Sequence, residues 1–149
     1  RRAQDLAQEV IKNIGDPGVF CVEMFLLDNE DLLVNEIAPR PHNSGHHTID
    51  SFTVSQYELQ IRALVGLPLV NPLQITPSVL LNVLGEEYTK LTDSYTTNRI
   101  LENQNARIYS YGKPDARPGR KMGHILFNGP SQEDLLSYAL ETHKVLTRV

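Results

Sequence analysis

Two glutamates each interrupt an apolar segment, and the two segments are close enough in sequence to form a hairpin. Glu23 lies in VFCVEMFLL (residues 19–27) and Glu36 lies in LLVNEI (32–37). The intervening DNED (28–31) is typical of a turn. A turn centred in the middle of DNED places Glu23 opposite Glu36, and directly opposed side chains are about 4.5–5.5 Å apart at Cβ.

Opposed carboxylates among apolar neighbours repel each other and lose hydration. Either one carboxyl is protonated or a cation lies between the two. Mg²⁺ prefers a few carboxylates together with phosphate oxygens, so Glu23 and Glu36 are candidate ligands for this ion. The alternative is a different register in which each glutamate faces water, because hairpin register depends on the length of the turn.

The polar segment NEIAPRPHNSGHHTID (35–50) follows, and its residue types suit an anion. Arg40 lies between two prolines, which stiffen the backbone on both sides and hold a guanidinium that can stabilise developing negative charge. HNSG (42–45) supplies an imidazole, an amide, a hydroxyl and backbone N–H groups for an oxyanion. The alternative is that Asn-Ser-Gly is simply a common turn sequence. His46 and His47 are not expected to form a metal pair, because adjacent residues do not share a strand face, and capping or solvating the loop is their alternative role.

A second polar segment, YGKPDARPGRKMGH (111–124), concentrates positive charge in a chain whose formal net charge is −4. A phosphate group is the ligand that such a cluster of basic residues is expected to bind. A solvated basic loop is the alternative. The four basic residues at the centre of the segment are Lys113, Arg117, Arg120 and Lys121.

The elements around these segments indicate an α+β protein with antiparallel hairpins. Residues 86–105 are ambiguous, with a short helix near 98–102. The remaining predicted elements are helices over 1–14, 52–65 and 131–146, and strands over 78–85, 106–112 and 121–127, the last two joined by the basic loop.

Composition excludes several classes of protein. The mildly negative net charge of this 149-residue chain argues against a nucleic-acid binder that works by bulk electrostatics. We find no run long enough for a membrane helix and no secretory signal. Cys21 is the only cysteine, which suits a reducing compartment. The chain opens inside a helix pattern whose apolar face has nothing before it to cover it, so we expect a piece of a longer protein.

Taken together, four segments resemble the C-terminal half of the N5-carboxyaminoimidazole ribonucleotide synthase family. These are ATP-grasp enzymes of purine biosynthesis, which in fungi and plants are fused into phosphoribosylaminoimidazole carboxylase. The resemblance runs in order over roughly residues 15–127. The four segments are GVFCVEMF, LLVNEIAPRPHNSGHHTID, SQYELQIRALVGLPL and YGK…RPGRKMGH.

The resemblance implies the C-terminal part of an ATP-grasp fold over residues 1–72, followed by a small C-terminal β/α subdomain over 73–149. It implies a cytoplasmic, homodimeric ligase that uses ATP and Mg²⁺. Where the enzyme is part of the fused carboxylase, the resemblance also implies a lyase or decarboxylase. The partners are bicarbonate, 5-aminoimidazole ribonucleotide and the rest of the parent chain, with no nucleic acid and no membrane. ATP would phosphorylate bicarbonate to carboxyphosphate, and this species, or CO₂ released from it, would carboxylate the substrate amine.

The resemblance also implies roles for single residues. Glu23 and Glu36 match the Mg²⁺ ligands. Of the two catalytic positions, Arg40 matches the arginine next to the carboxyphosphate and His42 matches the loop around bicarbonate and the nucleotide. The basic residues that hold the 5′-phosphate are matched by Lys113 and Arg120. The substrate-binding positions as a whole are matched by Asn43, Ser44, Lys113, Arg120 and Lys121.

One position departs from the wider ATP-grasp superfamily. Many members place an asparagine ligand two residues after the second glutamate, where this chain has Ala38, which leaves Asn35 as no more than a candidate substitute ligand.

Two rival interpretations stay open. Formate-dependent glycinamide ribonucleotide transformylase is a sister enzyme, but it reads His-Asp-Thr-Gly where this chain has HNSG (42–45). The second rival interpretation is a non-catalytic interaction module that kept the fold after losing the chemistry. The resemblance places the adenine pocket upstream of Arg1, so we expect this segment alone to be inactive.

Overall fold

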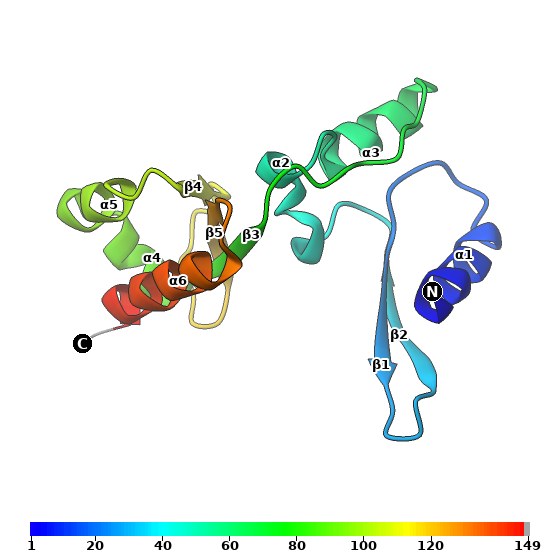
Figure 1. Cartoon of the computed structure of the whole chain (residues 1–149), viewed down its shortest axis with the longest axis horizontal. Coiled ribbons are helices and arrows are strands. Elements are labelled where there is room, and N and C mark those ends of the chain that lie inside the picture. Colours follow the sequence, from blue (N-terminus) through cyan, green and yellow to red (C-terminus); the bar gives the residue numbers. More distant parts are fainter. Residues whose placement is uncertain (148–149) are drawn as a thin grey trace. The chain divides into compact units, whose positions relative to one another are not determined.

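The computed structural model describes residues 1–147, and the chain divides into two compact units, Arg1–Leu73 and Gln74–Val149. The division lies beside the boundary after residue 72 that the sequence suggests. The functional roles given to the two parts stay a prediction. Helices and antiparallel sheets occur in both units (Figure 1), so the α+β class is confirmed.

The first unit is built around a two-stranded hairpin. It contains α1 (Arg2–Lys12), β1 (Cys21–Leu26), β2 (Leu32–Ala38), a 3₁₀ turn η1 (Asn43–Gly45), α2 (Thr48–Ser51) and α3 (Gln56–Val65). Helix α1 lies beside the hairpin, where Arg2 pairs with Asp31 at 3.7 Å. It buries none of its residues within the described chain.

The expected helix over 52–65 is shorter at its N-terminal end and is preceded by a separate turn of helix. Phe52 is extended (φ −129°, ψ 157°) and ends α2. Ser55 then caps α3 by accepting a hydrogen bond from Glu58 N at 3.2 Å. A serine cap of this kind satisfies an amide that the helix itself leaves unpaired, so the helix starts after Ser55.

The second unit is a three-stranded antiparallel sheet in the order β3-β5-β4, covered by helices. β5 is central, and six of its residues, Met122 to Phe127, are buried. The predicted pairing of the strands near 106–112 and 121–127 is confirmed. The elements are β3 (Ser78–Leu84), α4 (Gly85–Leu91), α5 (Ser94–Leu101), β4 (Ala106–Ser110), β5 (Lys121–Asn128) and α6 (Gln132–Thr147).

A single hydrophobic core joins this sheet to its helices. Leu91 of α4 and Ile100 of α5 lie in the same cluster as the central strand. From α6, Leu135, Ala139 and Leu146 complete it.

The ambiguous stretch 86–105 contains two helices, α4 and α5, rather than one short helix near 98–102. Each begins at a local cap: Glu87 Oε2 accepts from Leu84 N at 2.9 Å, and Asp93 Oδ2 accepts from Thr96 N at 2.9 Å. The hydrogen bonds that Thr96 N and Thr96 Oγ1 donate to the Asp93 carboxylate lower the pKa of Asp93. The apolar periodicity of both helices is weak, because only a few positions of each helix are buried and the rest are largely polar.

One close contact lies between the basic loop and the start of α4. A Cβ on Gly85 would lie 2.0 Å from the backbone oxygen of Arg117, so the start of α4 and the loop approach each other only because residue 85 is glycine. None of the helices described is long and apolar enough to cross a membrane.

Candidate functional site

The hairpin register places Glu23 opposite Glu36, as the sequence predicts. The turn itself is not centred where DNED suggests: Leu26 pairs with Leu32 and Met24 with Val34. On that register Glu23 would face Asn35. A β-bulge between Glu23 and Met24 leaves Asn35 as an extra residue in β2 and shifts the pairing by one, which brings the two glutamates together.

The glutamates are not buried, contrary to the sequence-based argument for a desolvation cost. Glu36 is exposed, and the Glu23 side chain is 41% exposed. Apolar residues of the hairpin are also open to solvent, with Phe25 at 56% and Leu26 at 72%. Several of the apolar residues that suggested burial are therefore exposed, while those at the start of β1 are half-buried.

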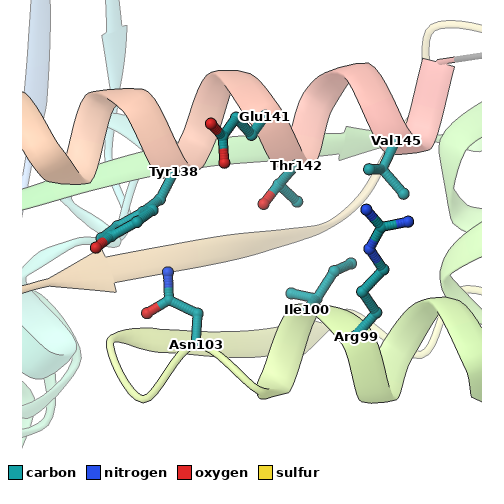
Figure 2. A pocket seen from close by; sticks show the side chains of 7 residues that line it. All are labelled: Arg99, Ile100, Asn103, Tyr138, Glu141, Thr142 and Val145. Atoms are coloured by element: carbon teal, nitrogen blue, oxygen red, sulfur yellow. The ribbon is translucent and has the colours of Figure 1, made fainter.

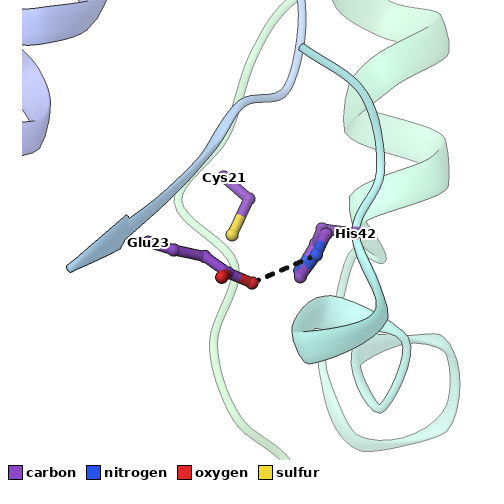
Figure 3. Close-up of side chains that lie close together, drawn as sticks. All are labelled: Cys21, Glu23 and His42. Carbon is purple, nitrogen blue, oxygen red and sulfur yellow. Dashed lines mark ion pairs between the residues drawn. The ribbon is translucent and has the colours of Figure 1, made fainter. Parts of the chain in front are cut away.

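His42 reaches back to the hairpin and contacts the first glutamate. Its Nε2 lies 3.3 Å from Glu23 Oε1, and Figure 3 shows the two side chains converging with that of Cys21. On the other side of the ring, Nδ1 lies 3.0 Å from Ser44 Oγ and accepts from Ser44 N at 3.4 Å. With Nδ1 accepting from Ser44 N, Nε2 is the ring nitrogen that faces the Glu23 carboxylate.

Gln56 holds the loop that carries His42. Its Oε1 accepts from His42 N at 3.0 Å, and its Nε2 donates to His42 O at 2.9 Å and lies 2.7 Å from His46 Nδ1. The residue is buried, at 8% exposure. No sequence pattern predicts this role, and a polar residue in the first turn of the helix over 56–65 is the local signal that points toward it.

Gly45 lets the loop close over that amide. A Cβ at this position would lie 2.5 Å from Gln56 Oε1 and 2.9 Å from Gln56 Cδ. Because the Gln56 amide is tied on both sides, it cannot swing away cheaply. Glycine is therefore required here by packing.

The two further histidines are structural, as one of the sequence interpretations has it. His46 Nδ1 lies 2.7 Å from Tyr57 Oη, and the two rings stack at 5.5 Å between centroids. His47 Nδ1 lies 3.1 Å from Ser51 Oγ, and burial lowers the pKa of His47. Both side chains therefore support the loop.

Arg40 is exposed on the loop, and its guanidinium donates to Pro41 O at 3.1 Å. This bond to the neighbouring carbonyl holds the side chain close to its own backbone. Asn43, with Ser44 and Gly45, forms η1 directly after His42.

The basic loop belongs to the second unit, and its charged groups largely bind the loop itself. Lys113 Nζ donates to Lys121 O at 2.6 Å and lies 5.3 Å from the Tyr111 ring centroid. Arg120 Nη1 donates to Asp115 O at 3.1 Å, and Arg117 pairs with Asp115 at 3.3 Å. The structure thus brings Lys113 and Lys121 together in one unit, and Glu23, Glu36, His42 and Ser44 together in the other.

A hollow in the second unit lies outside both groups. Arg99 of α5 and Tyr138 and Glu141 of α6 line it (Figure 2). None of the predicted site residues lines it.

Two family profiles match the chain. Residues 1–57 match the ATP-grasp domain, and residues 78–138 match the phosphoribosylaminoimidazole carboxylase C-terminal domain. The hairpin and its loop therefore lie in the part of the chain that matches the ATP-grasp profile, and the sheet of the second unit lies in the part that matches the carboxylase C-terminal profile. Over nearly its whole length the chain is similar to N5-carboxyaminoimidazole ribonucleotide synthases and phosphoribosylaminoimidazole carboxylases, so the predicted resemblance is confirmed.

Three known proteins illustrate the similarity. Phosphoribosylaminoimidazole carboxylase of Candida albicans is 46% identical over 148 residues, covering 94% of this chain and 26% of that protein. N5-carboxyaminoimidazole ribonucleotide synthase of Bacillus subtilis is 45% identical over 127 residues, covering 85% of this chain and 32% of that protein. The crystal structure of the Aspergillus clavatus synthase in complex with ADP and 5-aminoimidazole ribonucleotide superposes with a TM-score of 0.85 at 35% identity, covering 99% of this chain and 40% of that one.

The chain thus spans 26% and 32% of the two curated relatives named above. The ATP-grasp fold that the sequence predicts is confirmed by the matching profile and the superposition.

Proposed function

We propose that this chain is the metal- and substrate-binding part of an enzyme that carboxylates 5-aminoimidazole ribonucleotide with ATP and bicarbonate. The observation that carries the proposal is the pairing of Glu23 with Glu36 across the hairpin, beside a loop that presents His42 and Ser44. The similar Aspergillus clavatus synthase, solved with ADP and the ribonucleotide, supports the substrate class.

The donor set of the two glutamates fits Mg²⁺. Both ligands are carboxylate oxygens, and an exposed hairpin leaves the remaining positions to water and phosphate oxygens, as this ion prefers. Glu23 and Glu36 would hold the ion, and when bound it would neutralise phosphate charge during phosphoryl transfer.

Arg40 and His42 supply the remaining groups of the first unit. A bicarbonate oxygen attacks the γ-phosphorus of ATP, ADP leaves, and carboxyphosphate forms. Arg40, on backbone stiffened by two prolines, is placed to stabilise the negative charge of that species once its side chain leaves the Pro41 carbonyl.

The substrate amine then attacks the carboxyl carbon, or CO₂ released from it, and phosphate leaves. We assign to His42 the handling of the amine proton, because imidazole is the side chain that most often serves as a general acid or base, and Glu23 and Ser44 orient this one. Asn43 and Ser44 contact the bicarbonate and nucleotide.

In the second unit, Lys113, Arg120 and Lys121 bind the 5′-phosphate of the ribonucleotide. The loop that carries them is stiffened by its own hydrogen bonds, so little entropy is lost when an anion binds. The proposal also includes a homodimer and a cytoplasmic location, and a sole cysteine suits the latter.

The test is Glu36→Gln in the full-length protein that carries this segment. The change keeps the shape but removes the charge, so ATP turnover dependent on bicarbonate and ribonucleotide should fall on the order of 10²-fold while thermal unfolding is unchanged. Glu9→Gln, on the exposed surface of α1, is the matched control and should retain activity.

Unchanged turnover and unchanged Mg²⁺ dependence in Glu36→Gln would overturn the metal assignment. A parallel assay with formate and glycinamide ribonucleotide separates the sister enzyme. Turnover only with that pair would replace the proposed substrate class.

A further inference from the structure

Three chemically different metal ligands converge at the start of the hairpin. Cys21, Glu23 and His42 each offer one ligand atom, and these atoms lie within 4.8 Å of one another. All three residues are partly buried, so the cluster has support from the fold and access from solvent. Figure 3 shows the three side chains pointing toward one point.

The spacing suits a tetrahedral ion. Glu23 Oε1 and His42 Nε2 are 3.3 Å apart. Two ligands bound at about 2.0–2.2 Å in a tetrahedral arrangement are separated by about 3.3–3.5 Å. The Cys21 sulfur lies within 4.8 Å of the other two ligand atoms. Cys21 and Glu23 are two residues apart on β1, so their side chains share one face of the strand and can reach the same ion.

The ligand types select against Mg²⁺ and in favour of a thiophilic cation. Thiolate and imidazole suit Zn²⁺ and related ions, whereas Mg²⁺ prefers oxygen ligands alone. One sulfur, one nitrogen and one carboxylate oxygen leave a fourth position open, as in zinc sites with three protein ligands.

Neighbouring groups already orient the ligands. Ser44 Oγ lies 3.0 Å from His42 Nδ1 and 3.6 Å from Cys21 Sγ. When Nε2 binds a metal, the ring proton moves to Nδ1 and is donated to Ser44 Oγ, which is the outer hydrogen bond that metal-binding histidines usually make. Gln56 fixes the backbone of His42 on both sides, so the ligand from the loop is held in place.

We propose that Cys21, Glu23 and His42 form a binding site for a divalent cation of the Zn²⁺ class, distinct from the Mg²⁺ position between Glu23 and Glu36. The thiol loses its proton to solvent when it binds, because the thiolate is the ligand. Since Glu23 serves both positions, Zn²⁺ would also exclude Mg²⁺; this consequence, unlike the binding itself, rests on the proposed function.

The experiment titrates the full chain with Co²⁺ and Zn²⁺ alone. We expect one equivalent of Co²⁺ to give a thiolate-to-cobalt charge-transfer band that Zn²⁺ bleaches. Competition with a chromophoric chelator then measures Zn²⁺ affinity. Cys21→Ser should remove the band, and Cys21→Ser, Glu23→Gln and His42→Asn should each weaken Zn²⁺ binding by at least about 10-fold.

The matched control is a second histidine–carboxylate pair, His143 and Glu87, which is also 3.3 Å apart but lies in the second unit, whose sequence contains no cysteine. His143→Asn should leave both the band and the affinity unchanged. The proposal is overturned if Zn²⁺ binds Cys21→Ser as tightly as the unaltered chain, if the cobalt complex lacks the thiolate band, or if His143→Asn weakens binding equally. Circular dichroism of each variant shows that the comparison is between folded proteins.

Discussion

Gln56 is the single residue on which the geometry of the His42 loop most depends. Its amide pairs with the backbone of His42 through both of its polar atoms and also reaches His46. A buried amide that satisfies backbone groups has large consequences when removed, because those groups then lack partners away from water.

We predict that Gln56→Met destabilises the chain by about 1–3 kcal/mol, because methionine has similar size but no hydrogen-bonding amide. Urea unfolding measures the change. Gln8→Met, on the exposed face of α1, is the control and should stay within about 0.5 kcal/mol. Equal stability of the Gln56 variant would mean that water replaces the amide.

Arg40 is tested by a change that keeps its charge. Arg40→Lys in the full-length protein should lower kcat on the order of 10²-fold, because an ammonium lacks the planar fork that fits an oxyanion. Steady-state kinetics with saturating ATP and bicarbonate measures it. A variant with near-normal kcat would show that the guanidinium takes no part in the chemistry.

At the scale of elements, the basic loop combines a structural and a binding role. Lys113 and Arg120 each donate to a backbone carbonyl of the same loop, so the loop is shaped before any anion arrives. Gly85 permits its contact with α4.

We predict that Lys113→Ala or Arg120→Ala raises KM for the ribonucleotide and leaves KM for ATP nearly unchanged, because the substrate phosphate loses a charged donor. Arg117→Ala is the control: this residue is exposed and pairs with Asp115. Initial-rate kinetics with each substrate varied in turn separates the two KM values. Loss of ATP affinity with normal ribonucleotide affinity would assign the loop to the other ligand.

At the scale of the whole molecule, the two units differ in how well they cover their apolar residues. The second unit has a continuous core around β5. The first leaves large side chains open on the hairpin, on α3 and on the segment after it, with Leu69 at 64% and Leu73 at 66% exposure. Contiguous apolar surface of this kind promotes association.

We predict that the 149-residue chain, expressed alone, releases no phosphate from ATP in the presence of bicarbonate and ribonucleotide. Two carboxylates hold Mg²⁺ weakly unless phosphate oxygens complete its shell, and the resemblance places the ATP pocket outside this segment. A phosphate-release assay, with sedimentation at several concentrations to detect self-association, measures both. Turnover above background would place the ATP pocket within these residues.

Much of the hairpin was predictable because its signals are local. A polar turn between two β-forming segments predicts a hairpin, and the spacing of Glu23 and Glu36 predicts that they face each other. The resemblance of the quoted segments likewise needs only the order of residues, and the matching profiles confirm it. The roles of Arg40, Lys113 and the other site residues stay predictions.

Other features depended on contacts between residues distant in sequence, which no local pattern contains. The bulge that admits Asn35 changes the register by one residue, and a pattern of apolar letters is too coarse to reveal it. The prediction that the hairpin is buried was wrong for several of its apolar residues. Whether an apolar strand face is buried depends on which other element packs against it, and the strand sequence does not contain that information.

The sequence by itself determined which chemical groups the hairpin and loop carry, because residue types and a two-residue period are local properties. Only the tertiary structure decided that His42 turns back to Glu23 and Cys21, and that Gln56 holds it there. These pairs are separated by many residues of chain, and their meeting is set by the path of the loop and the packing of α3. A side chain's partners across such a distance follow from the fold as a whole.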